Sequence, residues 1–144
     1  MIIIGEKING AIPSIKQAIA ERNEALIIER TLAQAAAGAN FLDCAPSTAT
    51  EIEYETMVWL IGLMQGATNV PLCIDSPNAK LLARVIEEGH LNKPGMVNSV
   101  NEEGDKCETI FPLIAGTPWE VVGLTCDQEG IPADPAKKVE IAKR

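Results

Sequence analysis

Short apolar runs alternate with longer helix-forming segments along this chain, and no other feature limits its fold as strongly. The apolar runs have the length and residue bias of strands, and they cover residues 2–5, 39–44, 70–75, 95–100 and 119–126. The segments between them carry apolar residues at three- and four-residue spacing, and they cover residues 23–38, 51–67, 78–90 and 105–115. Because parallel strands must be joined by such crossovers, the sequence predicts an α/β fold with a parallel sheet.

The kind of parallel sheet follows from what the loops contain. No GxGxxG or GxxxxGK[ST] loop follows any predicted strand, which argues against a sheet that binds dinucleotides or hydrolyses nucleotides. A barrel is the better candidate, and residues 132–144 begin a further helix with Asp134 as N-cap and Pro135 in the first turn. A complete barrel has eight strands and typically about 250 residues. The prediction is therefore the N-terminal portion, about five βα units, of a TIM (β/α)8 barrel, with residues 1–144 forming one partial barrel domain.

Composition excludes several classes of function. The formal net charge is -8 and no cluster of Lys or Arg is interleaved with aromatic residues, so binding to nucleic acid is not expected. The start of the chain lacks the pattern of a secretion signal, and no apolar run approaches the roughly 18 residues of a membrane span. The four cysteines have no CxxC spacing and are expected to be reduced. We expect a cytoplasmic protein with no membrane partner.

Polar side chains follow every predicted strand. Glu6, Asp43, Asp75 and Asn98 come at the ends of the first four. In a barrel the carboxyl ends of the strands carry the active site, but Asp and Asn at such points also cap helices. In the stretch PLCIDSPN, Asn78 can cap the next helix, which leaves Asp75 with less structural reason to be there. The convergence of all four side chains favours a binding site.

Five ordered motifs carry a resemblance to a known family. They are IGEKING, LDCAPST, CIDSPN, MVNSVNEEGDKCETIFPLIA and GLTCDQEGIPAD, and together they cover essentially the whole chain. The chain resembles the pterin-binding methyltransferases that act on methyltetrahydrofolate and a corrinoid protein. The resemblance implies a TIM barrel in which Asp75 and Asn98 hydrogen-bond to the pterin ring, with Asp43 and Glu6 as further candidates for pterin binding. The alternative for Glu6 is a structural role that ties the first loop to the barrel mouth. The sequences CIDSPN and NEEGDKCE favour the glycine-betaine branch of the family.

The resemblance also implies a reaction and its partners. The methyl group on N5 of methyltetrahydrofolate would pass to the cobalt of a corrinoid, or the reverse, with the cobalamin carried by a partner protein. No metal ligand is then needed from this chain, and a homodimer is expected. Family members are about twice as long, and the asparagine that bonds to N5 lies on a later strand, so no catalytic residue is assigned. LDCAPST departs from the usual LD-N-G wording, which makes Asp43 a weaker candidate than Asp75.

Two alternatives remain open at the level of sequence. A dihydropteroate-synthase-like enzyme would use the same pocket, but it needs a diphosphate site on later strands. A non-catalytic pterin-binding module would keep Asp75 and Asn98 without the later asparagine.

Overall fold

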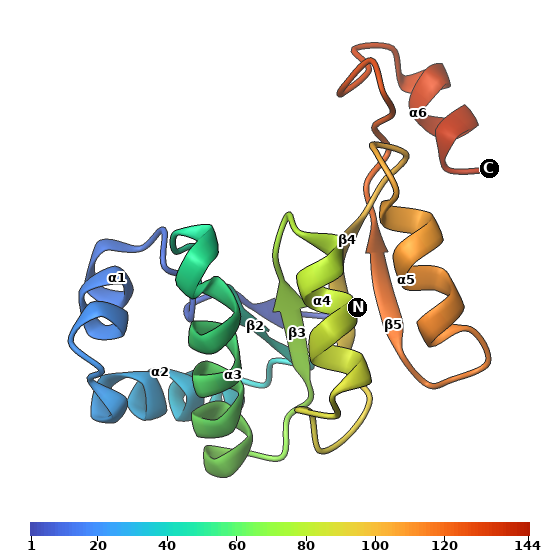
Figure 1. Cartoon of the computed structure of the whole chain (residues 1–144). Coiled ribbons are helices and arrows are strands. Elements are labelled where there is room, and N and C mark those ends of the chain that lie inside the picture. The colour runs from blue at the N-terminus through green and yellow to red at the C-terminus, as the bar shows by residue number, and fades with distance from the viewer.

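Strands and helices alternate in the computed structural model, which describes residues 1–144 (Figure 1). The strands are β1 (Ile4–Gly5), β2 (Phe41–Cys44), β3 (Leu72–Asp75), β4 (Met96–Val100) and β5 (Glu120–Gly123). The helices are α1 (Pro13–Ala20), α2 (Glu24–Ala36), α3 (Thr50–Ala67), α4 (Ala79–Glu87), α5 (Lys106–Ile114) and α6 (Pro135–Ile141). Each strand lies within one of the predicted apolar runs, so the predicted alternation is confirmed.

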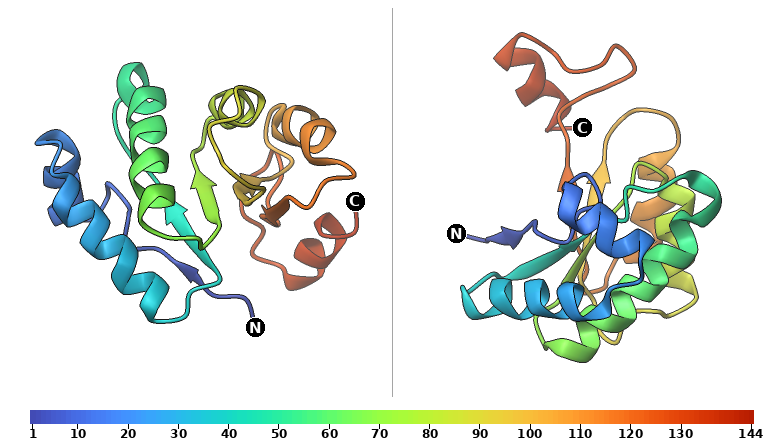
Figure 2. Two further views of the ribbon diagram at one scale, coloured as in Figure 1. Left: turned by 90° about the horizontal axis from the view of Figure 1, so that it is seen from below. Right: turned by 90° about the vertical axis from the view of Figure 1, so that its left-hand side faces the viewer.

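The five strands form one parallel sheet in the order β1-β2-β3-β4-β5. The sheet curves, and α2, α3, α4 and α5 lie in an arc along its outer side (Figure 2). Strands that are neighbours in sequence are also neighbours in space, which is the arrangement of a (β/α)8 barrel. The structure is therefore a partial TIM barrel of five βα units, as the sequence predicts.

Two details differ from the sequence-based expectation. Helix α1 was not predicted, although Pro13 stands in its first turn and Ile15, Ala18 and Ile19 form its buried side. In α2, the apolar spacing of segment 23–38 predicts a broad buried stripe, but Leu32 is 47% exposed, and the buried positions are Ile27, Thr31 and Gln34. The stripe is narrower than predicted because α1 and α3 flank α2 and leave one face in solvent.

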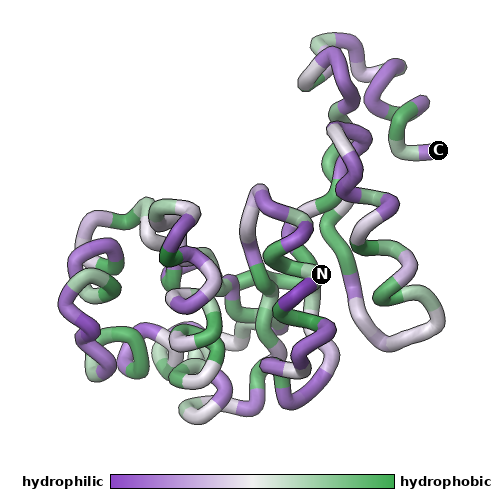
Figure 3. Tube along the Cα trace, in the orientation of Figure 1, coloured by the Kyte–Doolittle hydropathy of each residue, from purple (hydrophilic) through white to green (hydrophobic).

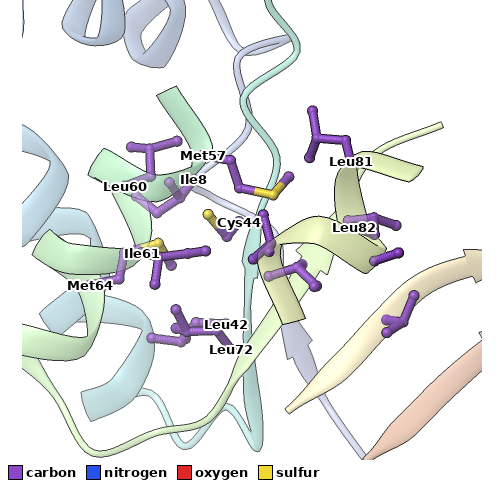
Figure 4. Close-up of a cluster of buried hydrophobic side chains, with 14 of the residues drawn as sticks. Ile8, Leu42, Cys44, Met57, Leu60, Ile61, Met64, Leu72, Leu81 and Leu82 are labelled. Atoms are coloured by element: carbon purple, nitrogen blue, oxygen red, sulfur yellow. The ribbon is translucent and has the colours of Figure 1, made fainter. Parts of the chain in front are cut away.

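The main hydrophobic core lies between the sheet and the helices. Leu42, Cys44 and Leu72 point outward from the strands, and helix side chains pack against them (Figure 4). Ile74 of β3 belongs to the same cluster. The helix side chains labelled in that view come from α3 and α4, and they are Met57, Leu60, Ile61, Met64, Leu81 and Leu82. Burial of this apolar surface is the main force that holds the helices on the sheet.

A smaller apolar cluster lies on the opposite, inner face of the sheet. It contains Phe41, Cys73 and Met96, with Ile4 and Val122 packed against it. Because side chains alternate between the two faces of a strand, the next inward-facing positions on β2, β3 and β4 are Asp43, Asp75 and Asn98. The inner face thus changes from apolar to polar toward the carboxyl ends of the strands.

Helix ends carry the caps that the sequence suggests. Asn78 Oδ1 accepts the Leu81 N–H at 3.2 Å at the start of α4, and Asp134 Oδ1 accepts the Ala136 N–H at 2.9 Å at the start of α6. Gly38 follows α2 with φ +86, in the left-handed region that favours glycine.

Helix α6 projects beyond the carboxyl end of β5 and is mainly hydrophilic (Figure 3). No helix combines the length and the apolar character needed to cross a bilayer.

Candidate functional site

The candidate site lies at the carboxyl ends of β2, β3 and β4. Asp43 pairs in register with Cys73, and Asp75 pairs in register with Asn98. A register shift follows Asn98, so that Val100 rather than Ser99 is the next residue of β4 paired with β5. Such bulges commonly redirect side chains beside functional sites. The structure therefore brings Asp43, Asp75 and Asn98 together on three adjacent strands.

Glu6 joins this group from the loop that follows β1. The strand is interrupted after Gly5, where Gln34 Oε1 of α2 accepts the Lys7 N–H at 2.7 Å. Parallel pairing with the end of β2 resumes beyond the interruption, where the Ala45 N–H donates to the Ile8 carbonyl at 3.1 Å. The Glu6 side chain is exposed, and its charge acts on both Asp43 and Asp75. Glu6 consequently lies at the rim of the site.

Asp43 is the most deeply buried member of the group. Its residue is 1% exposed, and its Oδ1 is buried without any hydrogen-bond partner in the chain. Burial, together with the charges of Asp75 and Glu6, raises the pKa of Asp43 to about 7. The Cys73 thiol and the Asn98 amide oppose this rise only in part. A buried polar atom without a partner is costly, so Asp43 Oδ1 is a position where a ligand group can bind.

Asp75 is half-buried at the end of β3. Burial raises its pKa, and the charges of Glu6 and Glu53 act in the same direction. The cap of α4 is supplied by Asn78 instead of Asp75, which confirms the capping role expected for Asn78. The Asp75 carboxylate therefore remains available for a ligand at the mouth of the barrel.

Sequence reasoning missed several residues that surround this group. Cys73 belongs to the apolar cluster of the inner face, and its thiol also lies beside the Asp43 carboxyl group. Glu53 and Ser76 are both buried and share a hydrogen bond of 2.6 Å. A pattern could have identified Glu53, because it lies on the same side of α3 as the buried Met57, Leu60 and Ile61. A charged residue on an apolar stripe requires a buried partner.

Other parts of the chain contribute no comparable constellation. No group of three His, Cys, Asp or Glu side chains could hold a metal ion. His90 lies after α4, where its ring contacts Tyr54 and Glu88, away from the candidate site. A cavity of about 650 Å³ lies between the β4–α5 loop, α5 and α6, but none of the four candidate residues lines it. The inner face at the strand ends remains the better site because buried polar groups converge there.

This arrangement favours a flat ligand with several hydrogen-bonding atoms. Ionised carboxylates only accept hydrogen bonds, a protonated carboxyl group also donates, and the Asn98 amide does both. Below them, Phe41, Cys73 and Met96 form an apolar floor. Small-molecule sites typically combine an apolar lining with a few polar groups that fix orientation. A reduced heterocycle with N–H donors and ring-nitrogen acceptors matches this combination.

Comparisons with known proteins give relatives of one chemical kind. No family model matches the chain. It is 50% identical over 145 residues to a methylcorrinoid:tetrahydrofolate methyltransferase of Eubacterium limosum, an alignment that covers 99% of this chain and 53% of that protein. It is also 29% identical over 150 residues to the methionine synthases of Mycobacterium tuberculosis and Mycobacterium leprae, covering 100% of this chain and 12% of each. The chain thus spans about half the length of the first relative, and its similarity to these methyltransferases extends over its whole length.

Proposed function

We propose that this chain is the pterin-binding part of a methyltransferase that moves a methyl group between tetrahydrofolate and a corrinoid. The 50% identity to a methylcorrinoid:tetrahydrofolate methyltransferase supports the chemistry. The observation that carries the proposal is the convergence of Asp43, Asp75 and Asn98 on adjacent strands, with one buried carboxylate oxygen left without a partner. A pterin ring would supply the missing donors and acceptors.

Each residue has a distinct part in the proposed pocket. Asp75 accepts N–H groups of the pterin, and the Asn98 amide pairs with a neighbouring donor and acceptor on the same ring. Asp43 meets the ring more deeply, and Glu6 closes the rim. Because a wrong ligand would leave these groups unpaired, the pocket would discriminate strongly against heterocycles with another hydrogen-bonding pattern.

The contribution of this chain to the reaction would be orientation. Holding the pterin on the polar strand ends fixes the direction of N5, and such positioning accounts for a large part of many rate enhancements. The corrinoid supplies the cobalt that accepts or donates the methyl group. N5 requires a proton or a strong hydrogen bond during the transfer, and no residue is assigned to that role.

The same proposal extends to the branch of the family, the carrier of the cobalamin, the oligomeric state and the location. CIDSPN and NEEGDKCE favour the glycine-betaine branch. A separate corrinoid protein would carry the cobalamin, the methyltransferase would act as a homodimer, and it would work in the cytoplasm.

Isothermal titration of methyltetrahydrofolate into the chain tests the pocket directly. Asp75→Asn removes the acceptor charge with little change in shape, and Asn98→Ala removes the paired amide. We expect each substitution to weaken binding by about 10-fold or more, since loss of a hydrogen bond to a charged or buried group costs about 1.5 to 3 kcal/mol. Circular dichroism and thermal melting establish that the variants fold.

Asp105→Asn is the matched control, because Asp105 is an exposed aspartate that pairs with Lys80 on the outer surface. It removes the same charge and should leave the affinity unchanged. Equal losses in the Asp75 and Asp105 variants would mean that net charge alone governs binding. A folded wild-type chain that does not bind methyltetrahydrofolate would refute the proposal that these strands already form the pocket.

A further inference from the structure

Glu53 is a buried carboxylate that the proposed chemistry does not use. It lies on α3 with 6% of its surface exposed, among the apolar side chains that pack on the sheet. Its Oε1 accepts a hydrogen bond of 2.6 Å from Ser76 Oγ, and Ser76 is itself 3% exposed. Burying a carboxylate in apolar surroundings costs folding free energy unless the group is paired. Its position therefore needs a reason beyond the packing of α3.

Ser76 connects this carboxylate to the candidate site. Its Oγ also accepts the Asn78 N–H at 3.0 Å, and its own N–H donates to the Asn98 carbonyl at 3.2 Å. Asn78 caps α4. One serine thus joins α3, the start of α4 and the end of β4, and it directly follows Asp75. These hydrogen bonds restrict the backbone conformation at Asp75 and Asn98.

We propose that Glu53 is a positioning residue, which acts through Ser76 to hold Asp75 and Asn98 in the geometry that a pterin ring requires. This inference rests on the proposed function for its ligand. The hydrogen bonds among Glu53, Ser76, Asn78 and Asn98 are independent of the ligand, because they are present in the ligand-free chain. Glu53 is not a catalytic residue, since Ser76 stands between it and the site.

The charge of Glu53 can be followed through the pKa of Asp75, a measurement that needs no ligand. The titratable groups that interact electrostatically with Asp75 are Glu6 from the β1 loop, Asp43 from β2 and Glu53 from α3, together with the buried thiols of Cys44 and Cys73. None of them is a cation. The charge of Glu53 contributes to the raised pKa of Asp75. A glutamine at position 53 keeps an oxygen that accepts from Ser76 Oγ but removes this charge.

The first experiment follows the side-chain carboxyl resonance of Asp75 by NMR as pH is varied, in the ligand-free chain. Glu53→Gln should lower the apparent pKa of Asp75. Glu55→Gln, on the exposed side of the same helix, should leave it at the wild-type value. If the two variants titrate alike, Glu53 does not act on Asp75 and the inference is overturned.

The second experiment measures methyltetrahydrofolate affinity by isothermal titration. Glu53→Ala and Ser76→Ala each remove one partner of the buried hydrogen bond, and both should weaken binding by about 10-fold or more. Glu53→Gln should restore the affinity to within about 3-fold of wild type at a pH where Asp75 is ionised, because the hydrogen bond to Ser76 persists. Wild-type affinity in both alanine variants would overturn the inference.

The two experiments also separate this inference from the proposed function. Absence of methyltetrahydrofolate binding in the wild-type chain would count against the proposed function, whereas the NMR comparison would still decide whether Glu53 governs Asp75. If Glu53→Ala does not fold, Ser76→Ala and Glu53→Gln still test the same contact from both partners.

Discussion

Asp43 combines deep burial with two neighbouring negative charges, and this combination makes stability depend on pH. Its pKa is about 7 in the folded chain against 3.8 for an ordinary aspartate. A raised folded-state pKa means that the stabilising contribution is fully present below pH 3.8 and is lost as pH rises through about 7. Above that pH the folded chain must accommodate a buried negative charge.

We therefore predict that the difference in unfolding free energy between Asp43→Asn and wild type is about 2 to 4 kcal/mol more favourable to the variant at pH 8 than at pH 4. Each unit of pKa shift is worth about 1.4 kcal/mol. The amide keeps the shape of the carboxyl group and does not titrate. Urea unfolding at a series of pH values, with Asp105→Asn as the exposed control, measures the difference. A pH-independent difference between wild type and Asp43→Asn would contradict the raised pKa.

At the same scale, the sequence indicated some residues of the candidate site and concealed others. Asp75 and Asn98 were predicted because each follows an apolar strand, and Asn78 left Asp75 free of a capping role. Their pairing across β3 and β4 needed the register, which no local pattern gives. Glu53 was missed because it sits inside a helix, where its contact with Ser76 depends on how α3 packs beside the β3–α4 loop.

Among the elements, β3 and β4 approach each other closely at Gly95. A Cβ built on Gly95 would lie 2.1 Å from the backbone carbonyl oxygen of Leu72, a distance that no side chain can relieve by changing rotamer. We predict that Gly95→Ala destabilises the chain by roughly 2 to 4 kcal/mol, because the start of β4 must shift away from β3. Chemical denaturation monitored by circular dichroism measures the loss.

Gly62→Ala provides the matched control for that substitution. Gly62 lies in α3, and a Cβ there would meet nothing within 4 Å. Alanine favours a helix interior over glycine by about 1 kcal/mol, so this variant should be slightly more stable than wild type. A similar loss of stability in both variants would show that the close approach of β3 and β4 is not the cause.

Helices were predicted where apolar periodicity was long or where an N-cap and a proline marked the start, as at α6, whereas the short α1 was missed. The predicted ranges for α2, α3, α4 and α5 match the structure because apolar residues recur over at least two turns. Helix α1 has only eight residues, so its apolar positions extend over about two turns and gave no helix prediction. Strand β5 ends at Gly123, three residues before the predicted end, since the chain turns toward α6 after the barrel rim.

On the scale of the whole molecule, a five-stranded section of a barrel leaves β1 and β5 as edges. Each edge presents unpaired backbone groups, and exposed apolar residues flank both, with Ile3 50% exposed beside β1 and Leu124 46% exposed beside β5. Such edges favour pairing with another chain. The inner face between them carries the candidate site, so a partner that covers both edges would also cover that site.

We predict that the 144-residue chain self-associates through these edges. Sedimentation velocity should give a coefficient that rises with concentration for the wild type, whereas the double variant Ile3→Lys, Leu124→Lys should remain monomeric, because charged side chains at sheet edges oppose pairing. Leu32→Lys is the control, since Leu32 is similarly exposed, at 47%, but lies on the outer face of α2. Association that survives the edge substitutions, or that Leu32→Lys abolishes equally, would place the contact on the helices instead of the open sheet.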